Sequence, residues 1–169
     1  MEQFYLSWLA GLIDGDGCFS IGVKVDNRVH IGKQVRIALK ENDDWILKEI
    51  QEKTGIGKIY YSNKGKPNGV CSWQTVSYSD AIRITELLLP YLRLKKEKAK
   101  QFLYAIKLLD GTKKYVKGKR MKGKMLRSKE TFLEIIKIAT TLNNDRQTKR
   151  YREFKNYEYW KEKIDKLNW

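Results

Sequence analysis

Two stretches near the N-terminus alternate apolar and polar positions with a period of two. Apolar side chains occupy every second position from Phe19 to Val25, and again from Val35 to Leu39. This period is typical of a strand with one face in the core and the other in solvent. Asn27 and Gly32 lie between the two stretches, so we expect a β-hairpin with His30 in its loop.

Longer segments carry apolar side chains three or four positions apart, which predicts helices. In chain order they cover residues 4–14, 44–54 with Asp43 as the cap, 79–90, 99–106, 132–142 and 151–169. A second hairpin is expected from strands at 58–62 and 70–77, which a loop rich in Gly, Pro and Asn joins. The order αββαββα up to residue 90 predicts an α+β fold with a four-stranded antiparallel sheet and further helices at the C-terminus.

The length of 169 residues and the 41% of hydrophobic residues fit one globular domain. We expect a core over residues 4–109, a basic loop over 110–129 and C-terminal helices over 130–169. No apolar run reaches the roughly 18 residues of a membrane span, and no secretory pattern is seen. Two cysteines are no disulfide framework. We therefore expect an intracellular protein, in the cytoplasm or an organelle.

Histidine is too scarce for several kinds of catalytic site. His30 is the single histidine of the chain, and its position in an expected loop does not suit a Ser–His–Asp triad. One histidine with two distant cysteines also argues against a zinc site. Any hydrolytic chemistry must therefore depend on carboxylates, metal ions and lysines.

Positive charge is concentrated in the C-terminal half. The formal net charge is +15, and residues 1–90 carry as many acidic as basic side chains, so the surplus falls on residues 91–169. Nine basic and no acidic side chains lie between Lys113 and Lys129. Such a block attracts polyanions, which makes a nucleic acid the expected partner. A solvated basic loop, or a ribosomal or membrane-surface protein, would show similar charge.

The segment Leu9-Ala-Gly-Leu-Ile-Asp-Gly-Asp-Gly17 has a specific counterpart. It resembles the signature of the LAGLIDADG homing endonucleases at eight of nine positions, with Gly15 in place of the usual alanine. The predicted element order also resembles the core of that family, over about residues 4–109. One copy of the motif is present, which in this family implies a homodimer with its active sites at the interface.

Small side chains in the motif let two such helices approach closely. A dimer axis there would bring two Asp16 carboxylates together, which requires divalent cations between them. The resemblance implies that Asp16 is catalytic and binds Mg²⁺, with the Gly15 carbonyl as a second ligand. We expect Asp14 to satisfy backbone donors at the helix interface rather than to bind metal. The interface residues expected are Ala10, Gly11, Asp14 and Gly15.

Two further catalytic positions follow from the resemblance. Glu41 stands where the family carries a polar residue at the end of the second strand, so it is either an additional metal ligand or a solvated acid. Lys95 matches the catalytic-pocket lysine after the third core helix, where it would stabilise developing charge on the phosphate. The alternative for Lys95 is a surface lysine at the start of a basic helix.

Polar side chains on one face of the sheet are expected to contact DNA. The expected DNA-binding residues are Ser20, Lys24, Asp26, Gln34, Arg36, Lys40, Lys58, Tyr60, Ser62, Trp73 and Thr75. A strand of about 9 residues spans roughly 30 Å, or about 9 base pairs, so two half-sites suggest a pseudo-palindromic site of about 20 base pairs.

Together these features predict a Mg²⁺-dependent, site-specific endonuclease of the intron-homing type that cuts both strands of DNA as a homodimer. No membrane and no small-molecule substrate are expected. The main alternative is an intron RNA maturase or a regulator that keeps the fold without cutting. The intact Asp16 favours the nuclease, because a binding protein has less need of that carboxylate.

Overall fold

The computed structural model describes residues 2–111, 115–116, 119–120, 128–143 and 156–167. Its helices are α1 (Gln3–Asp16), α2 (Asp44–Thr54), α3 (Tyr78–Leu88), α4 (Lys96–Gly111), α5 (Lys129–Asn143) and α6 (Tyr157–Asp165). Its strands are β1 (Gly17–Val25), β2 (Val29–Lys40), β3 (Lys58–Ser62), β4 (Val70–Gln74) and the two-residue strands β5 (Tyr115–Val116) and β6 (Lys119–Arg120). The predicted α+β class and the order αββαββα are confirmed.

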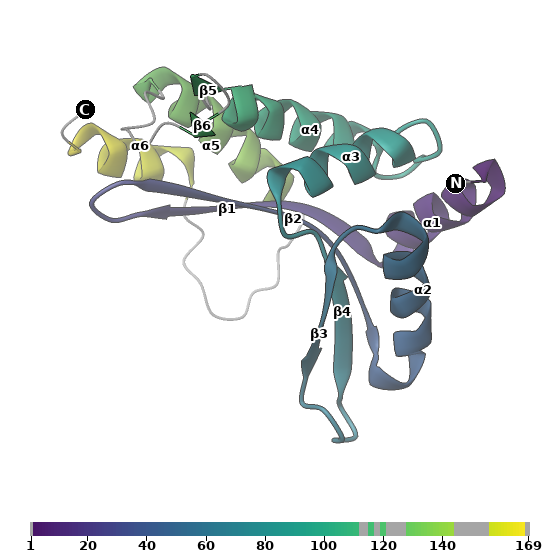
Figure 1. The fold of residues 1–169 in the computed structure, drawn as a ribbon. Coiled ribbons are helices and arrows are strands. Elements are labelled where there is room, and N and C mark those ends of the chain that lie inside the picture. Colours follow the sequence, from purple (N-terminus) through teal and green to yellow (C-terminus); the bar gives the residue numbers. More distant parts are fainter. Residues whose placement is uncertain (1, 112–114, 117–118, 121–127, 144–155, 168–169) are drawn as a thin grey trace.

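The sheet consists of two antiparallel hairpins that share the long central strand β2. The strand order is β1-β2-β4-β3. β1 pairs with β2 from Val29 to Ile37, whereas β4 pairs with β2 from Arg36 to Lys40. The two hairpins therefore overlap only near Arg36 and extend from there in different directions (Figure 1).

Helices cover one face of the sheet and leave the other face open (Figure 1). Of the apolar positions of β1 and β2 that were predicted to face the core, Phe19, Ile21, Val35 and Ile37 are buried, and Val23, Val25 and Leu39 are partly buried. The centroid of the Phe19 ring lies 5.5 Å from that of Phe102 in α4. α1 adds Leu9 and Ile13, both fully buried. Burying these side chains is the main force that holds the helices on this face.

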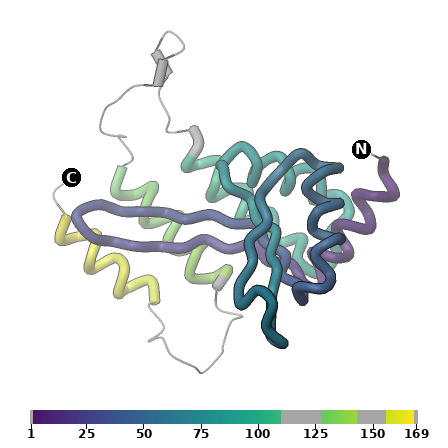
Figure 2. Tube along the Cα trace, turned by 60° about the horizontal axis from the view of Figure 1, so that its bottom comes forward, coloured from purple at the N-terminus to yellow at the C-terminus, as the bar shows by residue number. Residues whose placement is uncertain are grey.

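A second, smaller cluster lies under the distal half of the β1–β2 hairpin. Phe132 and Ile136 of α5 and Ile164 of α6 are buried there. The apolar side of the hairpin packs on them through Val23, Val25, Val29 and Ile31. Figure 2 shows the hairpin crossing α5, with its tip next to α6, so these two helices support its outer half.

Several predicted boundaries differ from the structure. β2 begins at Val29, so His30 lies in a strand rather than in a loop, because the turn takes only the residues between Val25 and Val29. α3 begins after Ser77, whose hydroxyl accepts a bond from the Asp80 backbone. Asp43 precedes α2 as predicted, but its side chain makes no capping bond, since a 3₁₀ turn (Glu41–Asp43) leads into the helix.

The C-terminal part of the chain is described in pieces. Most of the basic block between 113 and 129 lies outside the described residues, as do residues 151–155 of the predicted final helix. None of the helices described is long and apolar enough to cross a membrane.

Candidate active site and nucleic-acid interface

The C-terminal end of α1 presents the first candidate residue. Asp16 ends α1, and Gly17 begins β1 with no loop between them. A Cβ atom on Gly17 would lie 2.7 Å from the Cα of Ile13, so this close junction requires glycine. Asp16 is exposed, and within the described residues no hydrogen bond or ion pair holds its carboxylate. It is therefore an available oxygen donor at the surface.

Lys95 binds the same end of α1 from the turn before α4. Its Nζ donates to the carbonyl oxygens of Ile13 at 2.8 Å, Asp14 at 2.7 Å and Gly15 at 3.1 Å. A positive charge stabilises this end of a helix, where carbonyl groups lack partners within the helix. Burial lowers the pKa of the Lys95 ammonium by more than the nearby carboxylate of Asp14 raises it. Lys95 thus holds in place the helix end that carries Asp16.

Asp14 anchors the turn that contains Lys95. Its carboxylate accepts hydrogen bonds from the backbone N–H groups of Arg93 (2.7 Å), Leu94 (3.2 Å) and Lys95 (2.8 Å). Burial by itself would raise the pKa of the Asp14 carboxyl, but these donors and the Lys95 charge outweigh it and lower the pKa. The prediction that Asp14 satisfies backbone donors is confirmed, although the donors belong to its own chain rather than to a second copy.

Glycine occupies two exposed positions in the C-terminal half of α1, whereas the N-terminal half exposes Phe4, Ser7 and Trp8. Gly11 and Gly15 are four residues apart and exposed, and a Cβ atom on either would meet nothing within 4 Å. Nothing in this chain therefore requires glycine at these positions, whereas a second helix packed closely against α1 would. The prediction that Ala10 lies in the dimer interface is wrong. Ala10 is fully buried in the core of its own chain and cannot contact a second copy.

A metal site is incomplete in a single chain. Asp16 offers a carboxylate, and the adjacent Gly15 carbonyl, which already accepts a bond from Lys95, offers a second oxygen. These are the hard oxygen ligands that Mg²⁺ and Ca²⁺ prefer. The described residues contain no group of three or more His, Cys, Asp or Glu side chains that could hold a metal. The oxygens of Asp16 and Gly15 are thus of the kind that a divalent cation takes as ligands.

Glu41 lies in the 3₁₀ turn after β2 and makes a different contact from the one expected. Its Oε2 accepts a hydrogen bond from the Gly65 backbone N–H at 2.8 Å, in the loop between β3 and β4. Its own N–H donates to the carbonyl of Gly69 at 3.0 Å. One oxygen of the Glu41 carboxylate thus holds this loop, and its expected role as a metal ligand or a solvated acid stays a prediction.

The open face of the sheet gathers polar side chains around Arg36. The register places Arg36 beside Cys18 of β1 and Gln74 of β4, and Gln74 beside Lys58 of β3. Gln34 donates to Gln74, and the buried Nε of Arg36 has no hydrogen-bond partner in the described part of the chain. We call this group the inner cluster, which consists of Ser20, Gln34, Arg36, Lys58 and Gln74.

Trp73 and Thr75 were wrongly assigned to this face. Trp73 is fully buried, and its Nε1 donates to the carbonyl of Ile56 at 2.8 Å. Thr75 is buried after the end of β4, where its hydroxyl accepts from Val35 N–H at 3.1 Å. The sheet register puts Gln74 on the open face instead, which the alternation of apolar Cys71 and Trp73 could have indicated.

The remaining predicted contacts of the second hairpin and of the β2 end are accessible. Lys58, Tyr60 and Ser62 are exposed on β3, with Tyr60 directly beside Ser72 of β4. Lys40 at the end of β2 is also exposed.

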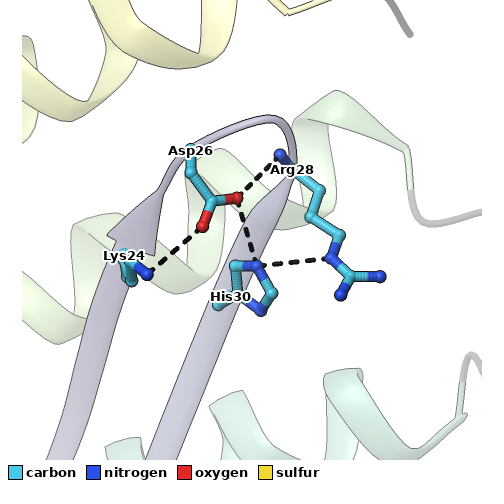
Figure 3. A network of polar contacts seen from close by, with 4 residues as sticks. All are labelled: Lys24, Asp26, Arg28 and His30. Atoms are coloured by element: carbon cyan, nitrogen blue, oxygen red, sulfur yellow. Dashed lines mark hydrogen bonds and ion pairs between the residues drawn. The ribbon is translucent and has the colours of Figure 1, made fainter.

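The tip of the β1–β2 hairpin carries a separate polar group, the outer cluster, which consists of Lys24, Asp26, Arg28 and His30 (Figure 3). The Asp26 carboxylate accepts from Arg28 N–H at 3.2 Å and lies 3.3 Å from the Lys24 ammonium and 3.2 Å from His30 Nε2. Arg28 Nε donates to the same His30 nitrogen at 3.3 Å. The Arg28 N–H is the main cause of the lowered pKa of Asp26, which therefore stays ionised among basic side chains.

Residues 9–109 match the family of proteins described as LAGLIDADG endonuclease. The chain belongs to the LAGLIDADG endonuclease family. It is 33% identical over 116 residues to the DNA endonuclease I-CvuI of Chlorella vulgaris, an alignment that covers 66% of this chain and 70% of I-CvuI. The single-motif architecture fits this family.

Solved structures agree with the fold. I-CvuI in complex with a DNA target has a TM-score of 0.77 at 24% identity and covers 98% of this chain and 95% of its own. Its complexes were determined with 2 mM Mg in one case and 2 mM Ca in another, which is consistent with a divalent metal. The archaeal intron-encoded I-Vdi141I, complexed with DNA, has a TM-score of 0.75 at 21% identity over 98% of both chains.

A longer relative matches this chain with part of its length. The LAGLIDADG meganuclease I-AabMI, bound to uncleaved DNA, has a TM-score of 0.66 at 25% identity. The match covers 82% of this chain but 44% of I-AabMI. One copy of this chain therefore corresponds to less than half of that meganuclease.

Proposed function

We propose that this protein is a homodimeric, site-specific DNA endonuclease that hydrolyses one phosphodiester in each strand with divalent metal, Mg²⁺ in particular. The observation that carries the proposal is the exposed Asp16 carboxylate, which has no hydrogen bond or ion pair within the described part of the chain and ends a helix with two exposed glycines, Gly11 and Gly15. Each copy supplies one such carboxylate, so the cleavage site is complete when two copies meet. The location we propose is intracellular, where DNA targets lie.

The chain's own residues have distinct parts in the reaction. Asp16 and the Gly15 carbonyl would hold the metal, which when bound supplies charge that activates water and stabilises the leaving oxygen. Lys95 binds the Gly15 carbonyl directly. Through its other two bonds to the end of α1, it positions the helix end that carries the Asp16 carboxylate. Asp14 in turn holds the Lys95 backbone, so a misplaced turn at 93–95 would shift the catalytic oxygens.

Target recognition is assigned to the open face of the sheet. The inner and outer clusters place Arg, Gln and Lys side chains along both strands of the β1–β2 hairpin, and these residue types can contact base edges or phosphates. Two copies would read two related half-sites, in a target of about 20 base pairs.

The catalytic assignment is tested with Asp16→Asn. We expect this variant to select the same sequences from a randomised DNA library but to lose at least about a thousand-fold in Mg²⁺-dependent cleavage, an effect of the size that loss of key charge stabilisation produces. Glu52→Gln, which removes an exposed carboxylate of α2, is the matched control and should cleave normally. Undiminished cleavage by Asp16→Asn would refute the assignment, and binding without cleavage by the wild type would favour the maturase or regulator.

The dimer is tested with Gly11→Leu. Because nothing within 4 Å obstructs a side chain at Gly11, the monomer should keep or gain stability, by up to about 1 kcal/mol from the better helix propensity. The same side chain would block close approach of a second α1. We therefore expect sedimentation to show a folded monomer that no longer cleaves. An unchanged dimer would place the interface elsewhere.

A further inference from the structure

The open face of the β1–β2 hairpin has a gap between its two polar clusters. Moving outward from Asp16, the cross-strand pairs on this face are Cys18–Arg36, Ser20–Gln34, Gly22–Gly32 and Lys24–His30. The third pair contains no side chain. Both glycines are exposed, while the opposite face of the hairpin stays packed on α5 and α6 (Figure 2).

The fold does not require glycine at this pair. Neither Gly22 nor Gly32 has a positive φ, in contrast to Gly55, Gly57 and Gly65. A Cβ atom on Gly22 would meet nothing within 4 Å, and one on Gly32 would meet the Gly22 backbone at 3.9 Å, an ordinary contact. Glycine also weakens a strand interior, so the pair is not explained by stability.

We infer that each DNA half-site is read in two blocks, with a tolerant window between them that lies under the Gly22–Gly32 pair. The inference rests on the proposed function. Base edges lie at the floor of a major groove about 8.5 Å deep, so reading them requires side chains. The backbone N–H and C=O groups of the glycine pair lie in the plane of the sheet, where they pair between strands or point sideways. They therefore cannot reach the bases in place of those side chains.

The spacing of the strand sets the size of the window. Ser20 and Lys24 are four residues apart, or about 13 Å along the strand, which corresponds to about 4 base pairs. The outer and inner clusters cover the ends of this interval. About 2 base pairs in each half-site therefore remain without direct contact, at symmetry-related positions in the two halves.

The experiment is a selection from a plasmid library with a randomised palindromic target, read both as bound and as Mg²⁺-cleaved sequences. For the wild-type protein, we expect base-pair changes in the two blocks of the target to slow cleavage about ten-fold or more. Base-pair changes in the window should alter the cleavage rate less than about three-fold. Sequence preference that runs without a gap along the half-site would overturn the inference.

Two variants test the cause of the gap. Gly22→Arg adds a side chain that can reach a base, and we expect a new preference of about ten-fold inside the window with both blocks unchanged. Gly22→Ala adds too little to reach a base and should keep the wild-type profile. If Gly22→Arg leaves the window tolerant, or if Gly22→Ala slows cleavage of every target about ten-fold, missing side chains are not the reason for the gap.

Comparing bound with cleaved sequences distinguishes failure of this inference from failure of the proposed function. A protein that binds selected sequences but cuts none contradicts the nuclease assignment, while its binding profile still shows whether the window exists. A protein that selects no sequence contradicts both.

Discussion

The two hairpins of the sheet present similar polar faces but are stabilised by different means. The β1–β2 hairpin packs apolar side chains on helices along its whole length, first on α4 and then on α5 and α6. In the β3–β4 hairpin, β4 buries Cys71 and Trp73 in the core, but four of the five β3 side chains are exposed. Figure 1 shows this hairpin beside α2 and extending away from α3, α4, α5 and α6. Polar tethers hold its free part, from Glu41 to Gly65 and from Asp44 to Tyr61.

The open face of the sheet is thus supported in two ways, by apolar burial under one hairpin and by additional hydrogen bonds to the end of the other. Apolar burial is cooperative, so a defect under β1–β2 is expected to lower the stability of the whole domain. A hydrogen bond on an exposed hairpin acts locally, because breaking it frees a segment that already exchanges with solvent. We therefore expect mutations in the two hairpins to differ in how far their effect spreads through the domain, as well as in how much stability they cost.

The largest effect is expected under the β1–β2 hairpin. Ile136 is fully buried between α5 and the hairpin, so Ile136→Ala should lower the free energy of unfolding by about 2–5 kcal/mol through lost burial and a cavity. Urea denaturation measures this. Lys137→Ala, at the exposed neighbouring position, should change stability by less than about 0.5 kcal/mol. A loss below about 1 kcal/mol for Ile136→Ala would mean that α5 does not support the hairpin.

A smaller and local effect is expected in the β3–β4 hairpin. Glu41→Ala removes the acceptor of the Gly65 N–H, and one such bond contributes about 1 kcal/mol. Amide hydrogen exchange in residues 63–69 should accelerate about five-fold, while the urea midpoint stays unchanged. Glu52→Ala, on the exposed side of α2, is the control. Faster exchange that spreads into β1 would contradict a local tether.

The smallest effect is a change in titration at the second tether. The Tyr61 hydroxyl donates to Asp44 Oδ2 at 2.6 Å, and this bond raises the pKa of Tyr61 because the carboxylate favours the protonated phenol. Asp44→Asn should therefore lower the pKa of Tyr61, measured by NMR of the labelled ring. Lys48 favours the phenolate, so Lys48→Met should shift the pKa of Tyr61 in the opposite direction. Equal titration in all three proteins would show that the tether does not form in solution.

Local signals predicted most of the elements. The bounds of β3, residues 58–62, were predicted as observed, because Gly57 and the Asn63–Gly69 loop mark both ends. The alternation in β1 correctly identified which side chains face the core. In β4, by contrast, the wrong set of alternate positions was assigned to the open face. The alternation of apolar Cys71 and Trp73 could have indicated the right set, and the pairing of Gln74 with Arg36 confirms it.

In the candidate site, local features were likewise predicted, whereas contacts between distant residues were not. The motif at residues 9–17 pointed to Asp16 through its resemblance to the family signature at eight of nine consecutive positions, which is a local feature of the sequence. The partners of Asp14 lie 79–81 residues away in the chain, and no spacing in the sequence indicates that the N–H groups of residues 93–95 converge on it. The contact between Glu41 and Gly65 escaped prediction for the same reason.

The sequence by itself determined the helices and strands, the two glycines on the exposed side of α1 and the carboxylate at its end, because periodicity, turn residues and side-chain volume act over a few neighbouring positions. The tertiary structure decided the register of β2 with β4, the three carbonyl oxygens that Lys95 binds and the loop that Glu41 holds. These depend on how distant segments pack. Hydrogen bonds between them are short in range and directional, so their partners exist only after the core has brought the segments together.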